Sequence, residues 1–345
     1  MRGVVLQGER NVSVEDLPDP SISTPDATIV RVDATAICGS DLHLYHAASG
    51  FEGTRLGHEF IGTVVEIGDE VRSVSKDDRV IVAGVIGCGR CAACVARDPV
   101  VCRNTGTRVF GTRPDLPGGQ AEYVEVPATD ASVLRIDGGI TDEQAVLLTD
   151  ILPTGYLGAE RAGIRPGTTV AVIGLGPVGL LAVTCARLFS PARIIAVDPL
   201  AERRERAEAL GAEGLDPSEG GTLAQVMDRT NGWGADAVIE AVGADATIVD
   251  AVMCAAPGST VSIVGVSFNV ALPFPMIVAT LKRLTIRPML ASVPSTWDTL
   301  VPLLMNGALR PDGIFTHRMG LSEAADAYTL FDEHTALKVL LDPTR

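Results

Sequence analysis

Short runs of alternating apolar and polar residues dominate the first 150 residues of this chain. Residues 28–34 (TIVRVDA), 61–68 (IGTVVEIG) and 78–82 (DRVIV) are of this kind. An alternation of period two places the apolar side chains on one face of a strand, and glycines between such runs favour turns. We therefore predict short antiparallel strands in this part of the chain, arranged as a partly closed β-barrel.

A helical spacing of apolar residues begins near residue 142. Residues 142–148 (DEQAVLL) have this spacing, and the stretch from 153 to 163 is predicted to continue as a further helix. From Gly167 onwards, strand and helix patterns alternate, with helices at 177–189 and at 201–210. Apolar strands are expected at 169–174, 193–198, 235–240, 259–265 and 284–287. This alternation predicts a doubly wound parallel sheet with right-handed crossovers.

The two patterns divide the chain into two predicted domains. A length of 345 residues suits this division, because a single core of that size is unusual. The β-rich domain is expected to comprise residues 1–152 and 290–345, since the tail from about Ala291 is predicted to return to it. The doubly wound domain is expected to span residues 153–289. The predicted fold class is thus α/β, with a β-barrel domain and a Rossmann domain.

Composition and charge narrow the possible functions. The chain is 46% hydrophobic and 21% charged, as ordinary globular proteins are. Its formal net charge of −15 argues against nucleic acid or an anionic membrane as a partner. No apolar run reaches the length of a membrane span, and the first residues lack the apolar core of a signal peptide. Seven cysteines, four of them spaced as metal ligands, indicate the reducing cytoplasm.

Four of these cysteines form one tight cluster within residues 87–103. Thiolates are soft, charged donors, and Zn²⁺ accepts four of them in a tetrahedron. Free thiols or local disulfides are the alternative, which the regular spacing in a cytoplasmic chain disfavours. Four protein ligands leave no open position, so we expect a structural zinc here. Its predicted ligands are Cys88, Cys91, Cys94 and Cys102.

A glycine fingerprint typical of dinucleotide binding follows the strand that begins at Thr169. In the segment Gly174–Gly179, which includes Pro177 and Val178, the first glycine permits a tight turn. Gly176 lets a pyrophosphate approach the backbone, and the last glycine lets helix pack on strand. The helix that follows offers free N–H groups to phosphate. A plain strand–turn–helix of a flavodoxin-like domain is the alternative, which the context of the fingerprint disfavours.

An acidic residue lies where this fingerprint requires one. Asp198 comes nineteen residues after Gly179, at the end of the second strand. Its carboxylate is expected to bind the adenosine ribose hydroxyls and to repel a 2′-phosphate, which favours NAD over NADP. Arg203, assigned to the cofactor site, and Arg204 weaken that preference without reversing it.

A second metal site is suggested by Cys38 and His58, but one cysteine and one histidine do not define a coordination. Cys38 alone would also suit a buried core position. A third protein ligand would have to be a carboxylate such as Glu59 or Asp150. Three protein ligands would leave one position open for a substrate oxygen, as in catalytic zinc sites.

With these motifs, the chain resembles the zinc-dependent medium-chain alcohol dehydrogenases, essentially from end to end. The resemblance rests on Cys38-Gly-Ser40-Asp41-x-His43, Gly57-His58-Glu59, the four-cysteine segment, Thr149-Asp150-Ile-Leu-Pro-Thr154-Gly155, the Gly174–Gly179 turn with Asp198, and the closing Ala336-Leu-Lys338-Val-Leu-Leu. It implies a GroES-like catalytic domain and a Rossmann domain with the active-site cleft between them. The best-known members have cysteine where this chain has Asp150; an aspartate there resembles the bacterial branch with secondary-alcohol and formaldehyde dehydrogenases.

The resemblance also implies roles for single residues. Cys38, His58 and Asp150 would hold the catalytic zinc. Glu59 would contact these ligands without binding zinc or would alternate with one of them on the zinc, and Asp41 would orient the ring of His58. Two zinc ions per chain are therefore expected.

The proton path and the cofactor contacts are implied in the same way. Ser40 would accept the proton of the alcohol, His43 would pass it to solvent through the cofactor ribose, Thr154 would hold the nicotinamide, and Lys338 would contact the pyrophosphate. Each role has a plain alternative. Ser40 could cap a helix that begins near Asp41, and His43 and Lys338 could be exposed side chains. Thr154 could serve a turn beside Pro153 and Gly155.

The sequence thus predicts an enzyme that transfers a hydride between an alcohol and NAD, interconverting alcohol and aldehyde or ketone. A polyol, formaldehyde or unsaturated-aldehyde enzyme on the same scaffold is the first alternative. A non-catalytic, cofactor-binding redox sensor is the second, because fold alone does not imply function. We expect a cytoplasmic homo-oligomer, a tetramer by analogy with bacterial relatives or a dimer, with a small-molecule substrate and neither nucleic acid nor membrane as a partner.

Overall fold

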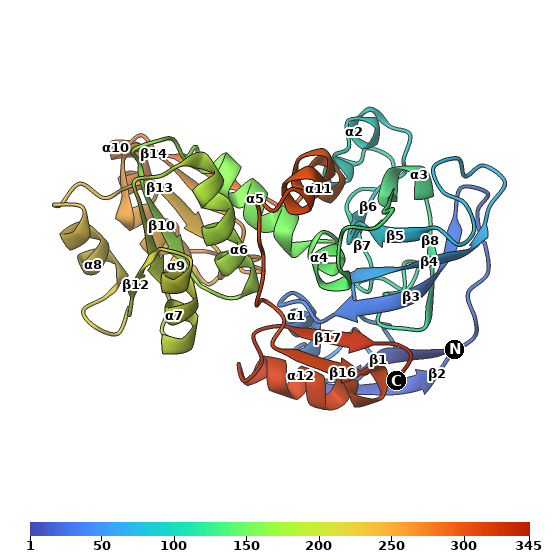
Figure 1. Ribbon diagram of the computed structural model, residues 1–345. Helices are drawn as coiled ribbons and strands as arrows, with labels where there is room; N and C mark the ends of the chain where they lie inside the picture. Colours follow the sequence, from blue (N-terminus) through green and yellow to red (C-terminus); the bar gives the residue numbers. More distant parts are fainter. The chain divides into compact units, whose positions relative to one another are not determined.

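The structure is a computed structural model that describes all residues from Met1 to Arg345. The chain forms two compact units, each described here by itself (Figure 1). The first unit comprises Met1–Pro153 and Ser292–Arg345, and the second comprises Thr154–Ala291. The boundaries predicted from the sequence lie after residues 152 and 289. No helix combines the length and the apolarity that crossing a bilayer requires.

A seven-stranded sheet is the main element of the first unit. Its order is β16-β17-β3-β4-β5-β9. The seventh strand, β8, pairs with residues 28–31 of β3, whereas β17 pairs with residues 35–36 of the same strand. All neighbours are antiparallel except β16 and β17, which confirms the predicted short antiparallel strands. The strands are β3 (Thr28–Ala36), β4 (Glu59–Ile67), β5 (Arg79–Val82), β8 (Tyr123–Val126), β9 (Val133–Arg135), β16 (His317–Gly320) and β17 (Val339–Asp342).

The remaining elements of this unit cover the sheet or extend it. Two further antiparallel pairs are β1 (Arg2–Gly8) with β2 (Asn11–Asp16) and β6 (Val85–Ile86) with β7 (Arg108–Val109). The helices are α1 (Asp41–Tyr45), α2 (Ala92–Val95), α3 (Thr129–Ser132), α4 (Asp142–Leu147), α11 (Trp297–Met305) and α12 (Ala324–Asp332), with short 3₁₀ turns at Pro99–Val101, Val293–Ser295 and Leu321–Glu323. Helix α5 (Ile151–Arg161) carries the chain into the second unit.

Two apolar clusters stabilise the first unit. Inside the barrel, Phe60 and Phe110 meet edge to face with ring centroids 5.1 Å apart. The second cluster joins β1, α1, α12 and β17, and there Tyr45 stacks on Tyr328 at 5.2 Å. β3 is buried on both faces except at Arg31 and Asp33, so its burial exceeds what an alternating pattern predicts.

The second unit is a doubly wound domain, as predicted. Its six strands are all parallel in the order β12-β11-β10-β13-β14-β15. They are β10 (Thr169–Ile173), β11 (Arg193–Val197), β12 (Glu213–Leu215), β13 (Ala235–Glu240), β14 (Ala255–Ile263) and β15 (Thr285–Pro288). Helices α6 (Pro177–Ala186), α7 (Ala201–Ala209), α8 (Thr222–Arg229), α9 (Asp245–Cys254) and α10 (Met276–Leu281) cover the sheet, and a 3₁₀ turn (Arg187–Phe189) ends α6 early. Cys185 and Cys254 are fully buried, as small core residues.

Candidate active site

Strand register brings the residues of the candidate metal site together. On β3, Ala36 pairs with Glu59 of β4 on one side and with Leu340 of β17 on the other. Cys38 therefore leaves β3 at the edge where His58 enters β4 and Lys338 enters β17. Since the pairs are antiparallel, three segments distant in sequence meet at one end of the sheet.

Asp150 reaches the same place from the joint between two helices. Helix α4 begins with a capping box of Thr141 and Gln144 and ends at Leu147. Beyond it, the carbonyl of Leu148 accepts a hydrogen bond from the buried indole Nε1 of Trp297 at 3.1 Å. The carbonyl of Thr149 accepts one from the amide of Gly84 at 2.9 Å. These two bonds fix the backbone on which the Asp150 carboxylate is carried.

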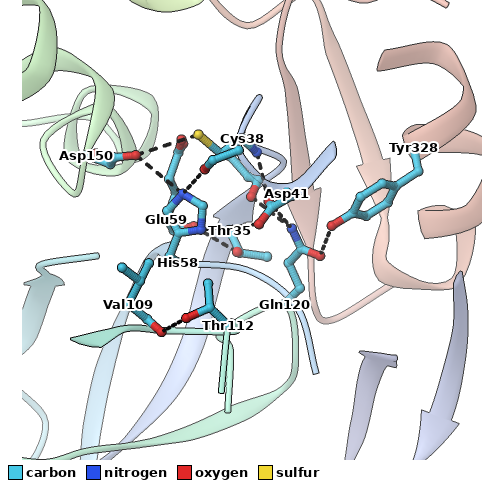
Figure 2. Close-up of polar contacts among 12 residues, drawn as sticks. Thr35, Cys38, Asp41, His58, Glu59, Val109, Thr112, Gln120, Asp150 and Tyr328 are labelled. Carbon is cyan, nitrogen blue, oxygen red and sulfur yellow. Dashed lines mark hydrogen bonds and ion pairs between the residues drawn. The ribbon is translucent and has the colours of Figure 1, made fainter. Parts of the chain in front are cut away.

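The donor atoms of Cys38, His58, Glu59 and Asp150 all lie within 4.8 Å of one another. Asp150 Oδ2 is 3.4 Å from His58 Nε2 and 3.7 Å from Cys38 Sγ (Figure 2). One sulfur, one imidazole nitrogen and two carboxylates form a donor set that suits Zn²⁺. Glu59 Oε2 is buried without a hydrogen-bond partner, as an oxygen beside a cation would be.

The charges around this cluster favour a cation. Burial lowers the pKa of His58, but Asp41, Cys38 and Asp150 together raise it well above its usual value. Burial raises the pKa of the Cys38 thiol and of the Glu59 carboxyl, and the negative groups nearby add to both shifts. A buried group of acidic side chains that disfavour one another's ionisation is stabilised by a dication. The residues present therefore fit a zinc ion.

Lys338 has a different partner from the one the sequence suggested. It was assigned to the cofactor pyrophosphate, with an exposed lysine as the alternative. Its ammonium is in fact buried and lies 2.7 Å from Glu59 Oε1. Lys338 thus compensates part of the negative charge around the metal donors and engages one oxygen of Glu59.

Ser40 immediately precedes helix α1, which begins at Asp41, and His43 lies within this helix. Ser40 is the N-cap residue, but its side chain makes no capping hydrogen bond. Its Oγ lies 3.2 Å from His58 Nε2 instead, so the hydroxyl is directed to the metal donors. The side chain of His43 is exposed, yet partial desolvation of its ring and, after it, the charge of His46 lower its pKa. Thr154 lies half-buried on α5, four residues after Asp150.

The four cysteines of the predicted structural zinc also meet. Their sulfur atoms lie within 4.8 Å of one another and form no disulfide. Cys91 Sγ is 3.6 Å from Cys94 Sγ and 3.9 Å from Cys102 Sγ. A tetrahedron with Zn–S bonds of about 2.3 Å has edges of about 3.8 Å. Gly87 makes room for this arrangement, because a Cβ there would stand 2.6 Å from Cys94 Sγ.

Donors around Cys102 prepare it to be a thiolate. Burial raises its pKa, but hydrogen bonds from the Thr105 hydroxyl and from backbone amides, including that of Cys88, lower it to about 5. Asn104 Nδ2 similarly donates to Cys88 Sγ at 3.1 Å. N–H and O–H groups directed at sulfur stabilise charged thiolate ligands.

In the second unit, the glycine turn has the geometry of a phosphate-binding loop. Gly174 adopts φ +89°, and a Cβ on Gly179 would stand 1.8 Å from the Gly174 carbonyl oxygen. By contrast, a Cβ on Gly176 would meet nothing within 4 Å. Helix α6 begins at Pro177, with Val178 in its first turn. The loop therefore leaves open space at a helix N-terminus, which suits an anion such as pyrophosphate.

Asp198 closes this loop from the neighbouring strand. Its Oδ2 accepts a hydrogen bond from the amide of Leu175 at 2.8 Å, and its Oδ1 accepts one from Leu200 at 2.9 Å. Arg203 Nη1 lies 3.7 Å from Oδ2, whereas Arg204 pairs with Asp216 at 3.0 Å. The carboxylate is thus fixed at the end of β11, with one arginine beside it.

Three buried polar residues near these sites escaped the sequence analysis. Gln120 and Tyr328 are fully buried and hydrogen bonded to each other at 2.9 Å. Glu240 is fully buried at the end of β13. The sequence could have indicated it, because an acidic residue directly follows the apolar residues Ala237–Ile239. Gln120 and Tyr328 left no comparable signal, because each looks like an ordinary residue of a β-rich or helical segment.

Two family models match the chain. The first, described as an alcohol dehydrogenase GroES-like domain, matches residues 24–137. The second, described as a zinc-binding dehydrogenase, matches residues 177–306. The chain therefore contains a GroES-like domain and a zinc-binding dehydrogenase domain.

Individual relatives cover nearly the whole chain. A probable zinc-binding alcohol dehydrogenase of Mycobacterium tuberculosis is 46% identical over 329 residues, which are 95% of this chain and 84% of the relative. A solved alcohol dehydrogenase from Thermus sp. ATN1 is 38% identical, with a TM-score of 0.93 and 99% of each chain covered. A putative zinc-binding dehydrogenase from Sinorhizobium meliloti 1021, solved with NADP bound, is 32% identical, with a TM-score of 0.85 and 99% of each chain covered.

Proposed function

This chain belongs to the family of zinc-dependent medium-chain dehydrogenases, and on that premise we propose that it transfers a hydride between a primary or secondary alcohol and NAD. The observation that carries the proposal is the donor set of Cys38, His58, Glu59 and Asp150. A site that only stabilised the fold would use all its donors on the metal, as the four-cysteine cluster does. Here Glu59 has Lys338 as a partner, and the Ser40 hydroxyl lies beside the metal-facing nitrogen of His58.

We assign the zinc to Cys38, His58 and Asp150, with Glu59 beside it. When bound, zinc would act as a Lewis acid that lowers the pKa of the alcohol, and the nicotinamide would take the hydride. Asp41 would hold the His58 ring through Nδ1, from which its Oδ1 lies 3.2 Å. Lys338 would keep Glu59 Oε1 engaged and thereby leave room for substrate at the open position.

The proton of the alcohol would leave through Ser40 and His43. The Ser40 hydroxyl would be the first acceptor and would release its own proton in the same step, since it lies at the metal donors and is not used as a helix cap. His43, on the same helix and exposed, would carry the proton to solvent. Its lowered pKa keeps the imidazole neutral near pH 7, which is the form that accepts a proton.

We propose NAD as the cofactor. The Asp198 carboxylate lies at the end of β11 beside the glycine loop, where it would bind ribose hydroxyls and repel a 2′-phosphate. Arg203 offsets this repulsion only partly, because its guanidinium lies 3.7 Å from the carboxylate. The carboxylate itself remains at the position that a 2′-phosphate would have to approach.

We further propose that the chain forms a homo-oligomer. Large apolar side chains are exposed on α10 and the segment before it, and a surface of this kind supports self-association. They are Phe268, Val270, Met276, Ile277 and Leu281. Size-exclusion chromatography with light scattering tests this; a monomer at micromolar concentration would contradict it.

The experiment for the main proposal is a substrate panel. Purified protein is assayed with primary alcohols, secondary alcohols and polyols, each with NAD and with NADP, and with the matching aldehydes and ketones in reverse. We expect NAD-dependent oxidation of simple alcohols that a chelator abolishes and added zinc restores. Turnover confined to polyols or to NADP would overturn the corresponding part of the proposal, and no turnover would favour a cofactor-binding protein.

A further inference from the structure

A line of buried polar side chains runs from His58 away from the metal donors to helix α12 (Figure 2). Tyr328 donates its hydroxyl to Gln120 Oε1 at 2.9 Å. Gln120 Nε2 donates to Asp41 Oδ2 at 3.3 Å and to the carbonyl of Ala36 at 3.1 Å. Asp41 Oδ1 in turn makes an ion-pair contact with His58 Nδ1 at 3.2 Å, and Nδ1 makes no hydrogen bond. The line connects a metal donor to a residue 270 positions later in sequence.

The direction of every hydrogen bond in this line follows from its ends. The Asp41 carboxylate and the Ala36 carbonyl only accept hydrogen bonds. The amide of Gln120 must therefore direct its NH₂ group at both of them, which leaves Oε1 for Tyr328. Since Oε1 only accepts, the Tyr328 hydroxyl must be the donor. Its proton thus fixes which way the Gln120 amide points.

The same logic continues to the histidine ring. Asp41 Oδ2 receives two hydrogen bonds, from the amide of Cys38 at 2.9 Å and from Gln120 Nε2. Oδ1 remains available for His58 Nδ1. A proton on Nδ1 leaves the lone pair on Nε2, the nitrogen directed at Asp150 and Ser40. This is the tautomer that binds a metal through Nε2.

Packing holds the line in place. Gln120 and Tyr328 are fully buried, and Asp41 is 3% exposed. Gln120 packs directly on Gly57, the residue before His58. Gly57 has φ +97°, and a Cβ on it would stand 2.4 Å from Gln120 Cγ. The backbone amide of Gln120 also donates to the carbonyl of Leu56 at 3.0 Å. Buried polar groups at such fixed distances have no water to replace a lost partner.

We propose that Gln120 and Tyr328 are positioning residues of the catalytic zinc site, acting through Asp41 to fix the orientation and tautomer of His58 and so to tighten metal binding. The proposal rests on the proposed function in one respect, namely that His58 is a zinc ligand. It predicts that the Tyr328 hydroxyl affects the metal, although its hydrogen bond goes to Gln120 and not to a metal donor.

Tyr45 provides a matched control. It packs against Tyr328 in the same apolar cluster, with ring centroids 5.2 Å apart, and is 5% exposed. No hydrogen bond of its hydroxyl occurs in the structure, and the hydroxyl is not part of the line. Tyr45→Phe and Tyr328→Phe therefore delete the same group from neighbouring rings, and only the second deletion leaves Gln120 Oε1 without a donor.

The experiment measures zinc release from the fully loaded protein into excess chromophoric chelator. The four-cysteine site in the same chain is the internal reference. We expect Tyr328→Phe to release the catalytic zinc about 3- to 10-fold faster than wild type, somewhat less than the 10- to 100-fold typical of direct partners of a metal ligand. Gln120→Glu, which places an acceptor against Asp41, should have a larger effect. Tyr45→Phe and the reference site should keep wild-type rates.

A second readout is the absorption spectrum after Co²⁺ has replaced the catalytic zinc. We expect the ligand-field bands to shift in Tyr328→Phe and to remain in Tyr45→Phe, with equal melting temperatures for both variants. Wild-type release rates and an unchanged cobalt spectrum in Tyr328→Phe would overturn the proposal, as would equal effects in both variants. A failure of the proposed function would give a different result: the wild-type protein itself would hold zinc only at the four cysteines. That result would also overturn the present proposal.

Discussion

The ammonium of Lys338 lies 2.7 Å from a carboxylate oxygen of Glu59, and neither side chain is more than 1% exposed. Burying two charges is costly unless each has a partner of opposite sign. In this chain the pair adjoins a cluster of further acidic donors, and Glu59 keeps a second oxygen without a partner. Lys338 therefore compensates part of the negative charge beside the metal donors.

Removing the ammonium should destabilise the first unit. We expect Lys338→Met to lower the free energy of unfolding by about 3–5 kcal/mol, because Glu59 is left as an uncompensated buried charge. Urea unfolding followed by the fluorescence of Trp297, which is buried in the same unit, measures this. The double variant Lys338→Met with Glu59→Gln should recover most of the loss. A single variant as stable as wild type would show that the pair contributes nothing.

Asp150 should be needed for the catalytic metal alone. We expect Asp150→Ala to reduce zinc from about two ions per chain to about one and to lower kcat at least 1,000-fold, since one anionic ligand is lost. Elemental analysis and steady-state kinetics measure the two effects. Asp137→Ala, at an exposed position on a surface turn, is the control. Unchanged turnover in Asp150→Ala would rule out this ligand assignment.

The four-cysteine site should be structural. We expect Cys102→Ser to lose one zinc and to make residues 87–103 a target for limited proteolysis, because four ligands within fifteen residues hold this segment together. Cys185→Ala removes a buried thiol from the other unit and should leave the zinc content unchanged. Two zinc ions per chain in Cys102→Ser would contradict the assignment.

Asp198 should decide between the two nicotinamide cofactors. Replacing it by serine removes the charge that opposes a 2′-phosphate while Arg203 remains nearby. We expect the NAD to NADP ratio of kcat/KM to fall about 100-fold, which corresponds to about 2.7 kcal/mol. Asp228→Asn, at an exposed position of the same unit, should keep the wild-type ratio. If Asp198→Ser also keeps the wild-type NAD to NADP ratio, the carboxylate does not distinguish a ribose hydroxyl from a 2′-phosphate.

Glu240 should make the second unit less stable as the pH rises. Burial raises the pKa of this carboxyl above its ordinary value of 4.5, against the effect of hydrogen bonds from Gly243, Thr247 and Val242. Between 4.5 and the raised value, the folded protein keeps a proton that the unfolded chain has released. Unfolding free energy therefore falls with rising pH, by up to about 1.4 kcal/mol per pH unit for one proton.

Glu240→Gln removes this titration and should flatten the dependence. Chemical unfolding of both proteins at several pH values from 4.5 upwards measures the difference. The amide keeps an oxygen for the Val242 and Gly243 amides and the Thr247 hydroxyl, so the loop after β13 should be retained. Parallel curves for the two proteins would mean that Glu240 ionises equally in the folded and unfolded states.

Much of the fold followed from periodicity. The change from alternating to helical spacing and the later alternation of strands and helices are local properties, so the two domains and most strands could be predicted. Burial along β3 could not, because its side chains, Val30 and Val32 among them, pack on segments far away in sequence. The early end of α6 at Ala186, followed by a 3₁₀ turn, was likewise not visible in the apolar pattern.

The two metal sites show the same contrast. Cys88, Cys91, Cys94 and Cys102 lie within fifteen residues, so spacing alone was enough to assemble them. For Cys38 and His58, spacing left the third ligand open between Glu59 and Asp150, and only the family resemblance pointed to Asp150. The structure brings all four donors together but does so through strand register, which no local pattern encodes.

The sequence by itself determined the features that depend on residues close together in the chain. These are the strands and helices, the four-cysteine cluster and the glycine turn with Asp198. Tertiary structure alone decided that Lys338 pairs with Glu59 and that Tyr328 reaches Asp41 through Gln120. These contacts join residues 79 to 279 positions apart. Such partners are chosen by register and by burial, because a buried polar group must find a partner wherever folding places one.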